Sequence, residues 1–171
     1  MEIIQIKYAL LYLLLFVSVY WGNACPDGWT SFKSKCYLKS DEKLTHKASL
    51  IYCQSLNGTL LSIQSAEENE FVKKFINLTT TNYYWLSAKK VATMSKEFYW
   101  IDGSSLNYSN WNKGEPNSLD QLNEICIDID RYGTWNDYAC SYTRMQFECA
   151  SLLNQQKPEN KQLWIKNCIF S

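Results

Sequence analysis

Seven cysteines limit what this chain of 171 residues can fold into more than any other feature of its sequence. Six of them lie between residues 25 and 149, and Cys168 stands apart near the end. No two have the Cys-x-x-Cys spacing of a zinc knuckle, and the sequence holds one histidine, His46, so a thiolate metal site is not indicated. The cysteines predict a small domain stabilised by disulfides in an oxidising compartment, but their number leaves the pairing open.

The opening residues have the pattern of a secretory signal peptide. Lys7 precedes an apolar run from Tyr8 to Val19, and Gly22 and Ala24 form the small-x-small pattern that signal peptidase recognises. This run is shorter than the about 20 apolar residues of a membrane span, which argues against the alternative of a retained anchor. We therefore expect residues 1–24 to be removed and the protein to be secreted, with no membrane insertion afterwards.

Length and charge narrow the remaining classes. A chain of this size has room for one compact core, which we place in residues 25–150. A polar tail at residues 151–171 carries Cys168. The 17 Lys and Arg residues balance the 17 Asp and Glu residues, so the composition predicts no nucleic-acid partner.

A first helix is predicted from about Leu44 to Leu56, where Asn57-Gly58 ends it. Ala48 and Ile51 share its apolar face with Leu44. We expect His46, a lone histidine on this helix, to lie at the surface.

A second helix is predicted after Ser65, because Ser65 and Glu68 form a capping-box pattern in which the glutamate reaches back to the N-cap. Its apolar stripe consists of Phe71, Val72, Phe75 and Ile76. Short strands are predicted around it, at residues 59–63, 83–87, 98–101, 124–129 and 145–149, with a hairpin ending near residue 38.

A long polar stretch from Asp102 to Asn123 separates two of these strands. A connection of this length inside a compact domain is usually functional or disordered. Tyr108 and Trp111 within it are suited to anchor it on the core, so we predict an ordered binding loop.

Oxygen-bearing side chains gather in and after this stretch. Carboxylate and amide oxygens are the ligands that calcium takes, and the X-Pro bond in Glu115-Pro116-Asn117 can be cis, which would bring the two flanking side chains to one side. A calcium ion held there with open coordination would accept two adjacent sugar hydroxyls, to which the same side chains also hydrogen-bond. The candidate residues for both calcium and carbohydrate are Glu115, Asn117, Glu124, Asn136 and Asp137.

Over residues 25 to about 149 the chain resembles the C-type lectin domain family. The resemblance rests on Cys25-Pro26-Asp27-Gly28-Trp29, Cys36-Tyr37, Cys53, Trp85-Leu86, Asn107-Tyr108-Ser109-Asn110-Trp111, Glu115-Pro116-Asn117, Glu124-Ile125-Cys126, Trp135-Asn136-Asp137, Cys140 and Phe147-Glu148-Cys149. It implies an α+β fold in which two helices flank small antiparallel sheets and a long loop carries the calcium. It also implies the disulfides Cys25–Cys36, Cys53–Cys149 and Cys126–Cys140.

The resemblance implies a sugar preference as well. Glu-Pro-Asn looks like the mannose-type triplet, which selects equatorial vicinal hydroxyls. The acids of an auxiliary calcium site would fall near Val91, Ser95, Ser118 and Ile125, and none of these is acidic, so we expect a single calcium. The loop at residues 118–123 is slightly longer than in common mannose binders, and Leu119 and Leu122 make it more apolar, so a galactose preference stays open.

Two other functional classes remain as alternatives. Some family members bind proteins instead of sugars, although this chain keeps all five oxygen positions. An enzyme is not expected. The paired carboxylates of Glu115 and Glu124 could suggest a glycosidase, but both would be metal ligands, and no nucleophile–base pair is visible in the sequence. A signal peptide followed by one such domain is similar to arthropod lectins of humoral innate immunity, which suggests microbial glycans as partners by analogy.

Two kinds of modification are also predicted. Cys168, left over after the pairing, suggests a disulfide-linked dimer or, equally, a free thiol. Asn57, Asn77 and Asn107 each begin an Asn-x-Ser/Thr sequence and are candidate glycosylation sites. We favour the first two, because Asn107 falls in the stretch expected to be packed.

Overall fold

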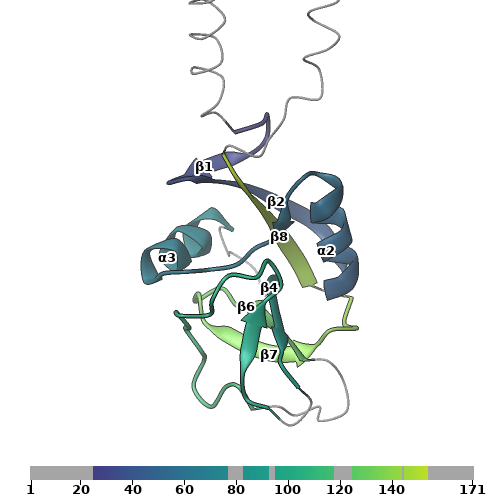
Figure 1. Cartoon of the computed structure of the whole chain (residues 1–171), viewed down its shortest axis with the longest axis vertical. Helices are drawn as coiled ribbons and strands as arrows, with labels where there is room; N and C mark the ends of the chain where they lie inside the picture. Colours follow the sequence, from purple (N-terminus) through teal and green to yellow (C-terminus); the bar gives the residue numbers. More distant parts are fainter. Residues whose placement is uncertain (1–24, 77–82, 93–94, 118–124, 144, 154–171) are drawn as a thin grey trace, which may run out of the picture.

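The computed structural model describes residues 25–76, 83–92, 95–117, 125–143 and 145–153 (Figure 1). The expected signal peptide, the tail with Cys168, the sequon at Asn77 and the candidate ligand Glu124 lie outside these ranges. Within them, no helix is long and apolar enough to cross a membrane.

The described elements alternate short strands with two helices. In chain order they are β1 (Thr30–Phe32), β2 (Lys35–Leu44), α2 (His46–Ser55), β3 (Thr59–Leu60), α3 (Ala66–Phe75), β4 (Tyr84–Lys90), β5 (Phe98–Trp100), β6 (Ile125–Ile129), β7 (Trp135–Ala139) and β8 (Met145–Leu152).

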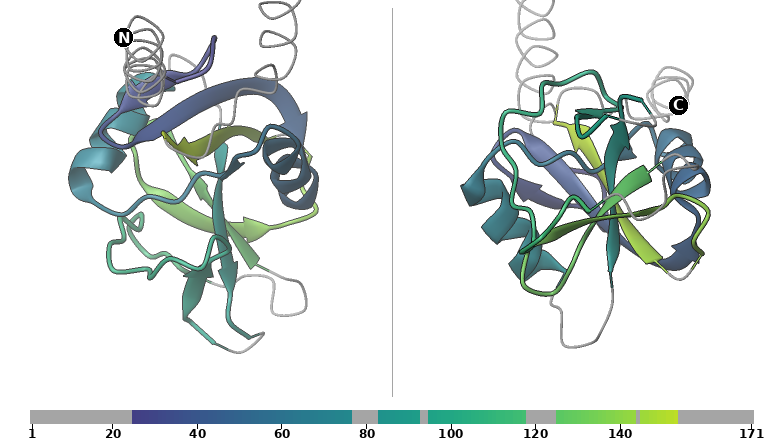
Figure 2. Two further views of the ribbon diagram at one scale, coloured as in Figure 1. Left: turned by 45° about the horizontal axis from the view of Figure 1, so that its top comes forward. Right: turned by 90° about the horizontal axis from the view of Figure 1, so that it is seen from below.

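The strands join into one connected sheet in the order β1-β2-β8-β4-β6-β7, with β3 beside β8 and β5 beside β4. These pairs are antiparallel except β4 with β8, which is parallel. Helices α2 and α3 lie on opposite sides of β2 and β8, and β4, β6 and β7 extend away from them (Figures 1 and 2). The predicted α+β fold with two flanking helices is confirmed.

The predicted disulfides are confirmed as well. Sulfur–sulfur bonds join Cys25 to Cys36, Cys53 to Cys149 and Cys126 to Cys140. The second bond links α2 to β8 across 96 residues of sequence. In the chain-entropy estimate, a disulfide that closes a loop of that length stabilises the folded protein by about 4–5 kcal/mol, because it restricts the unfolded chain.

Helix α2 does not bury the face that was predicted from its apolar residues Leu44, Ala48 and Ile51. Its buried residues are His46, Ser49 and Cys53, whereas Ile51 is 55% exposed. The disulfide to Cys149 explains the difference, because it turns the cysteine face of the helix towards β8. Hydrophobic periodicity does not register such a covalent constraint.

The expectation that His46 lies at the surface is wrong. Its side chain is fully buried, with Nε2 2.9 Å from the carbonyl oxygen of Leu86 on β4. The ring also meets Trp85 edge to face at a centroid distance of 5.4 Å. His46 therefore helps to dock α2 on the sheet.

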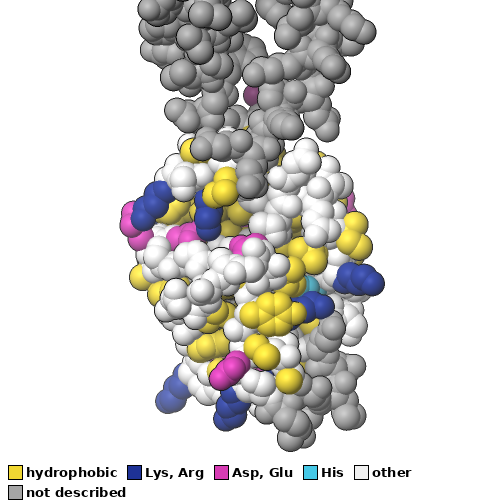
Figure 3. Space-filling model, in the orientation of Figure 1, with side chains coloured by type: hydrophobic (Ala, Val, Ile, Leu, Met, Phe, Trp, Pro, Cys, Tyr) yellow, Lys and Arg dark blue, Asp and Glu magenta, His cyan; other side chains and the backbone are white. Residues whose placement is uncertain are grey.

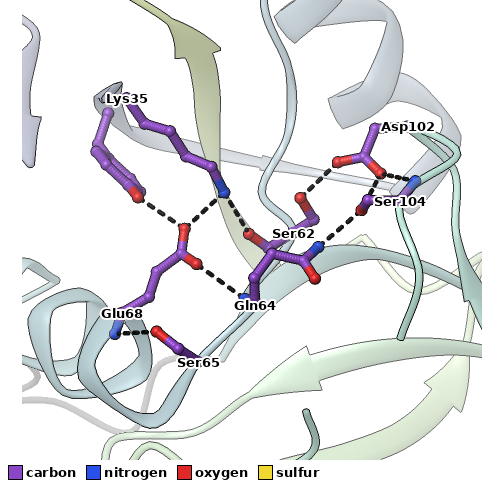
Figure 4. Close-up of polar contacts among 8 residues, drawn as sticks. Lys35, Ser62, Gln64, Ser65, Glu68, Asp102 and Ser104 are labelled. Atoms are coloured by element: carbon purple, nitrogen blue, oxygen red, sulfur yellow. Dashed lines mark hydrogen bonds and ion pairs between the residues drawn. The ribbon is translucent and has the colours of Figure 1, made fainter. Parts of the chain in front are cut away.

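Helix α3 begins at its predicted cap, but Glu68 bonds differently from a capping box (Figure 4). Ser65 Oγ accepts from the Glu68 N–H at 3.2 Å, as expected. The Glu68 carboxylate does not reach back to Ser65. It accepts from the Gln64 N–H at 2.8 Å and from Lys35 Nζ and Tyr37 Oη, both at 2.7 Å. Glu68 thus ties the start of α3 to β2.

The predicted apolar stripe of α3 faces the core. Val72 and Ile76 are buried, and Phe71 and Phe75 pack against them from the edge of the same cluster. A second buried cluster surrounds the Cys53–Cys149 disulfide.

Glu148 is a carboxylic acid inside the core. It is 1% exposed on β8, and neither carboxyl oxygen has a hydrogen-bond partner among the described residues. Burial raises the pKa of Glu148 well above its usual value, partly opposed by the charge of Lys39, its cross-strand neighbour. A buried polar group without a partner costs about 1–3 kcal/mol.

Replacing Glu148 by Leu should therefore stabilise the protein by about 1–3 kcal/mol at neutral pH. The pKa of Glu148 is higher in the folded than in the unfolded state, so the folded state binds the proton more tightly. The stability that the folded protein gains from a protonated Glu148 is fully present below the unfolded pKa of about 4.3, and it is lost as the pH rises through the folded pKa. Urea unfolding of the wild type and the variant between about pH 4 and pH 7 measures both effects.

The matched control is Glu97→Gln, which changes an exposed glutamate. This control should keep the pH dependence of the wild type, whereas Glu148→Leu should flatten it. Equal pH dependence in all three proteins would contradict the assignment.

Candidate functional site

The long connection brings two predicted side chains to one place. The Glu115–Pro116 peptide bond is cis. Asn117 donates from Nδ2 to Glu115 Oε1 at 2.7 Å and from its backbone N–H to Glu115 Oε2 at 3.1 Å. The side chains of Glu115 and Asn117 therefore lie on the same side of the loop.

Strand β7, at one end of the strand order, supplies the next two. Asp137 Oδ1 accepts a second hydrogen bond from the Asn117 N–H, at 3.0 Å. Asn136 Oδ1 accepts from Asn112 Nδ2 at 3.3 Å, and Asn136 Nδ2 donates to Asp128 Oδ1 at 3.0 Å. Four of the five predicted residues thus meet, and we name Glu115, Asn117, Asn136 and Asp137 the oxygen cluster.

Backbone pairing around Trp135 produces this meeting. The Trp135 N–H donates to the carbonyl oxygen of Asn110 at 2.8 Å, and the Asn112 N–H donates to the carbonyl oxygen of Trp135 at 2.9 Å. The Trp135 ring is fully buried and lies edge-on to Tyr108 at 5.6 Å and to Trp111 at 6.0 Å between centroids. The predicted anchoring of the loop by Tyr108 and Trp111 is confirmed for its described part.

A pocket of about 330 Å³ opens at the oxygen cluster. It is lined by Tyr83, Glu115, Asn117, Asp128, Asn136, Asp137, Tyr138 and Tyr142. None of these lining residues is a Lys or Arg. The pocket therefore combines carboxylates and amides with aromatic rings.

The carboxylates in this pocket repel one another. Burial and the neighbouring Asp137 carboxylate raise the pKa of Glu115. Burial, together with the charges of Asp130, Glu115 and Asp137, raises the pKa of Asp128 to about 7 despite the hydrogen bond from Asn136. A bound cation would remove this repulsion.

The donor set fits a hard cation. Carboxylate and amide oxygens without thiolates or imidazoles suit calcium or magnesium better than zinc. The described residues hold no group of three or more His, Cys, Asp or Glu side chains that would form a metal site by themselves. Among the described residues, the amide oxygens of Asn117 and Asn136 would therefore complete the ligands.

The sequence did not point to several residues around the oxygen cluster. Asp128 fixes the amide of Asn136, and Asn112 contacts the same amide from the other side. One signal for Asp128 was present: it is a charged residue in the otherwise apolar run Ile125–Ile129, and such a residue needs a buried partner.

A larger cavity of about 450 Å³ lies elsewhere, beside the network of Figure 4. Its polar lining is internally bonded: Asp102 accepts from Ser62 and Ser104, and Gln64 donates to Ser104 at 2.7 Å. Burial alone would raise the pKa of Asp102, but the hydrogen bonds from Ser104 and Ser62 outweigh it and lower the pKa. Lys35 lines this cavity and its charge also lowers the pKa of Asp102, whereas the carboxylates of the oxygen cluster repel one another with no Lys or Arg in the lining, so the oxygen cluster is the stronger candidate for a cation site.

Comparison with known proteins identifies the family of this fold. The family described as Lectin C-type domain matches residues 42–150, which is most of the described chain. The chain belongs to the C-type lectin domain family. The family includes carbohydrate-recognition domains and generally binds calcium, and its members are in general not enzymes.

Individual relatives are similar over most of this chain. The human low affinity immunoglobulin epsilon Fc receptor is 33% identical over 141 residues, covering 81% of this chain but only 42% of the receptor. A crystal structure of the cow C-type carbohydrate-recognition domain of CD23, in the presence of a GlcNAc2Man3 oligosaccharide, has a TM-score of 0.68 and 32% identity. It covers 76% of this chain and 97% of that domain. An SPL-1–GlcNAc complex has a TM-score of 0.66 and 31% identity, covering 74% and 94%.

Replacing Asp137 by Asn should stabilise the cation-free protein, because it removes one charge from the repelling pair with Glu115. The expected result is a higher melting temperature of the cation-free variant than of the cation-free wild type. Thermal melting in the presence of a chelator measures it, and the control Glu97→Gln should leave the melting temperature unchanged. A melting temperature at or below that of the wild type would contradict the repulsion.

Proposed function

We propose that this chain binds calcium at the oxygen cluster and recognises vicinal hydroxyls of carbohydrates there. The observation that carries the proposal is the convergence of Glu115, Asn117, Asn136 and Asp137 on one pocket. Membership of a family of carbohydrate-recognition domains supports it. Glu124, outside the described residues, is proposed as the fifth ligand because Ile125, its neighbour, begins the strand that pairs with β7.

The side chains would divide the work by charge. Glu115 and Asp137 would neutralise the cation, and their remaining lone pairs would accept hydrogen bonds from sugar hydroxyls. The amides of Asn117 and Asn136 would offer their oxygens to the cation and their Nδ2 groups to hydroxyl oxygens. Bound calcium supplies a positive centre that accepts lone pairs from two neighbouring hydroxyls.

Asp128 would not bind the cation itself but would orient the side chain of Asn136. Its hydrogen bond from Asn136 Nδ2 holds the amide of Asn136 with its oxygen turned away from Asp128. The oxygen of Asn136, which accepts from Asn112 Nδ2 at 3.3 Å in this structure, would then be the amide atom left for a cation. We propose one calcium in total, without an auxiliary site at Val91, Ser95, Ser118 and Ile125.

Mannose-type sugars are the proposed ligands, because Glu115-Pro116-Asn117 carries the triplet of mannose binders. The mannose- and GlcNAc-containing oligosaccharide present with the cow CD23 domain, and the GlcNAc bound to SPL-1, support this class. A galactose preference and a protein-binding role without sugar are the competing proposals. Retention on sugar columns distinguishes them from mannose binding.

The protein should bind to immobilised mannose in calcium and elute with chelator or at about pH 5, because protonated carboxylates no longer bind the cation. Glu115→Ala and Asn117→Ala should each abolish retention. Glu97→Ala, an exposed change outside the pocket, is the control. Retention on galactose alone would replace the mannose proposal, and passage through both columns in calcium would contradict monosaccharide binding altogether.

We further propose that residues 25–150 act as a secreted recognition domain for glycans, on microbial surfaces by analogy with arthropod humoral lectins. Three disulfides in so small a domain support an oxidising, extracellular environment. On the face drawn in Figure 3, Lys and Arg side chains are scattered instead of gathered, which favours a neutral ligand over nucleic acid.

Cys168 is proposed to join two chains, which would raise avidity by roughly 10²–10⁴ where geometry permits. Gel migration with and without reductant tests this: the dimer should disappear in reductant and in a Cys168→Ser variant. A monomer in both lanes would contradict it.

Asn57, Asn77 and Asn107 are proposed glycosylation sites. Both Asn57 and Asn107 are exposed, so Asn107 is as accessible as the favoured Asn57.

A further inference from the structure

Three tyrosines line the pocket beside the oxygen cluster and Asp128. Tyr83 directly precedes β4, Tyr138 lies on β7, and Tyr142 lies in the connection from β7 to β8. All three line the same pocket as the oxygen cluster. We name them the aromatic wall.

The aromatic wall is exposed and held in place. Tyr83, Tyr138 and Tyr142 are 45%, 43% and 36% exposed, so their rings are available to a ligand. The rings of Tyr138 and Tyr142 meet edge to face at a centroid distance of 5.0 Å. The Tyr142 N–H donates to the carbonyl oxygen of Ala139 at 3.1 Å, next to Cys140.

The disulfide beside these rings adds to their order. Cys140, between Tyr138 and Tyr142 in the sequence, is bonded to Cys126, and Cys126 is also the cross-strand partner of Tyr138. Tyr83 is fixed through its backbone, since its carbonyl oxygen accepts from the Gln146 N–H at 3.1 Å. A ligand would therefore meet two rings that already contact each other and a third tyrosine whose backbone is already paired, which lowers the entropic cost of binding.

The chemistry of the two halves of the pocket is complementary to a sugar chain. Hydroxyl groups point outwards from the edge of a sugar ring, and the faces of the ring present C–H groups that pack on aromatic side chains. Tyr138 follows Asn136 by two residues on β7, so its side chain projects from the same face of the strand about 7 Å further along. A glycan unit fixed by its hydroxyls at the oxygen cluster would direct its next unit along this line.

We propose that the aromatic wall binds the second sugar unit of an oligosaccharide whose first unit is held at the oxygen cluster. The protein then selects glycan chains over free monosaccharides. This inference rests on the proposed carbohydrate-binding function and adds to it the size of the ligand and the residues that sense it.

Calorimetric titration in calcium tests the proposal with three pairs of sugars: mannose and mannobiose, N-acetylglucosamine and chitobiose, and galactose and lactose. For at least one pair the wild type should bind the disaccharide about five- to tenfold more tightly, the size expected for one or two aromatic contacts. Tyr138→Ala and Tyr142→Ala, singly and together, and Tyr83→Ala should reduce this ratio towards one. The ratio cancels any loss that affects both sugars equally.

Conservative variants separate stacking from other effects. Tyr138→Phe and Tyr142→Phe should keep most of the ratio, because the ring remains, whereas Tyr142→Leu keeps apolar bulk but should lose it. Tyr99→Ala is the matched control, because Tyr99 is 46% exposed and does not line the pocket. It should leave the ratio unchanged.

The outcomes distinguish this inference from the function it rests on. If the wild type binds none of the six sugars in calcium, the proposed function fails and this inference with it. If the wild type binds a monosaccharide but shows no gain for the matching disaccharide, or if the alanine variants keep the full gain, the aromatic wall has no part in recognition and only this inference is overturned.

Discussion

The buried indole of Trp135 is the contact on which the rest of the structure depends. Its Nε1 donates to Asn69 Oδ1 on α3 at 2.9 Å, and its ring meets Trp100 on β5 at 5.6 Å between centroids. Its backbone N–H and carbonyl hold the long connection through Asn110 and Asn112. A single residue thus joins a helix, the sheet and the binding loop. The two residues that follow it in the chain belong to the oxygen cluster, so the core and the candidate site are positioned by the same contact.

The sequence predicted the parts of the fold that have local signals. The N-cap at Ser65 and the stripe of Val72 and Ile76 follow from residue spacing within one helix, and the disulfides follow from the family resemblance. The buried face of α2 and the burial of His46 were missed, because the Cys53–Cys149 bond and the carbonyl of Leu86 come from distant strands. Periodicity in one segment carries no information about such partners.

The candidate site shows the same limit. Glu115, Asn117, Asn136 and Asp137 were recognisable because each belongs to a short motif. Strand β7 itself was not predicted, since Trp135-Asn136-Asp137 also suits a turn at the end of a strand. The neighbours of the motifs escaped notice for a related reason. Asp128 and the aromatic wall gain their meaning only when β4, β6 and β7 lie side by side, and that arrangement depends on pairing between segments far apart in the sequence.

The position of β7 at the end of the strand order also bears on solubility. A terminal strand offers unpaired backbone groups to strands of other molecules, and proteins commonly protect such edges with charge or with a covering loop. Here the segment around Trp111 covers the beginning of β7, and the carboxylates of Glu115 and Asp137 stand beside its middle. The acidic residues proposed to hold a ligand would thereby also discourage edge-to-edge association of the protein with itself.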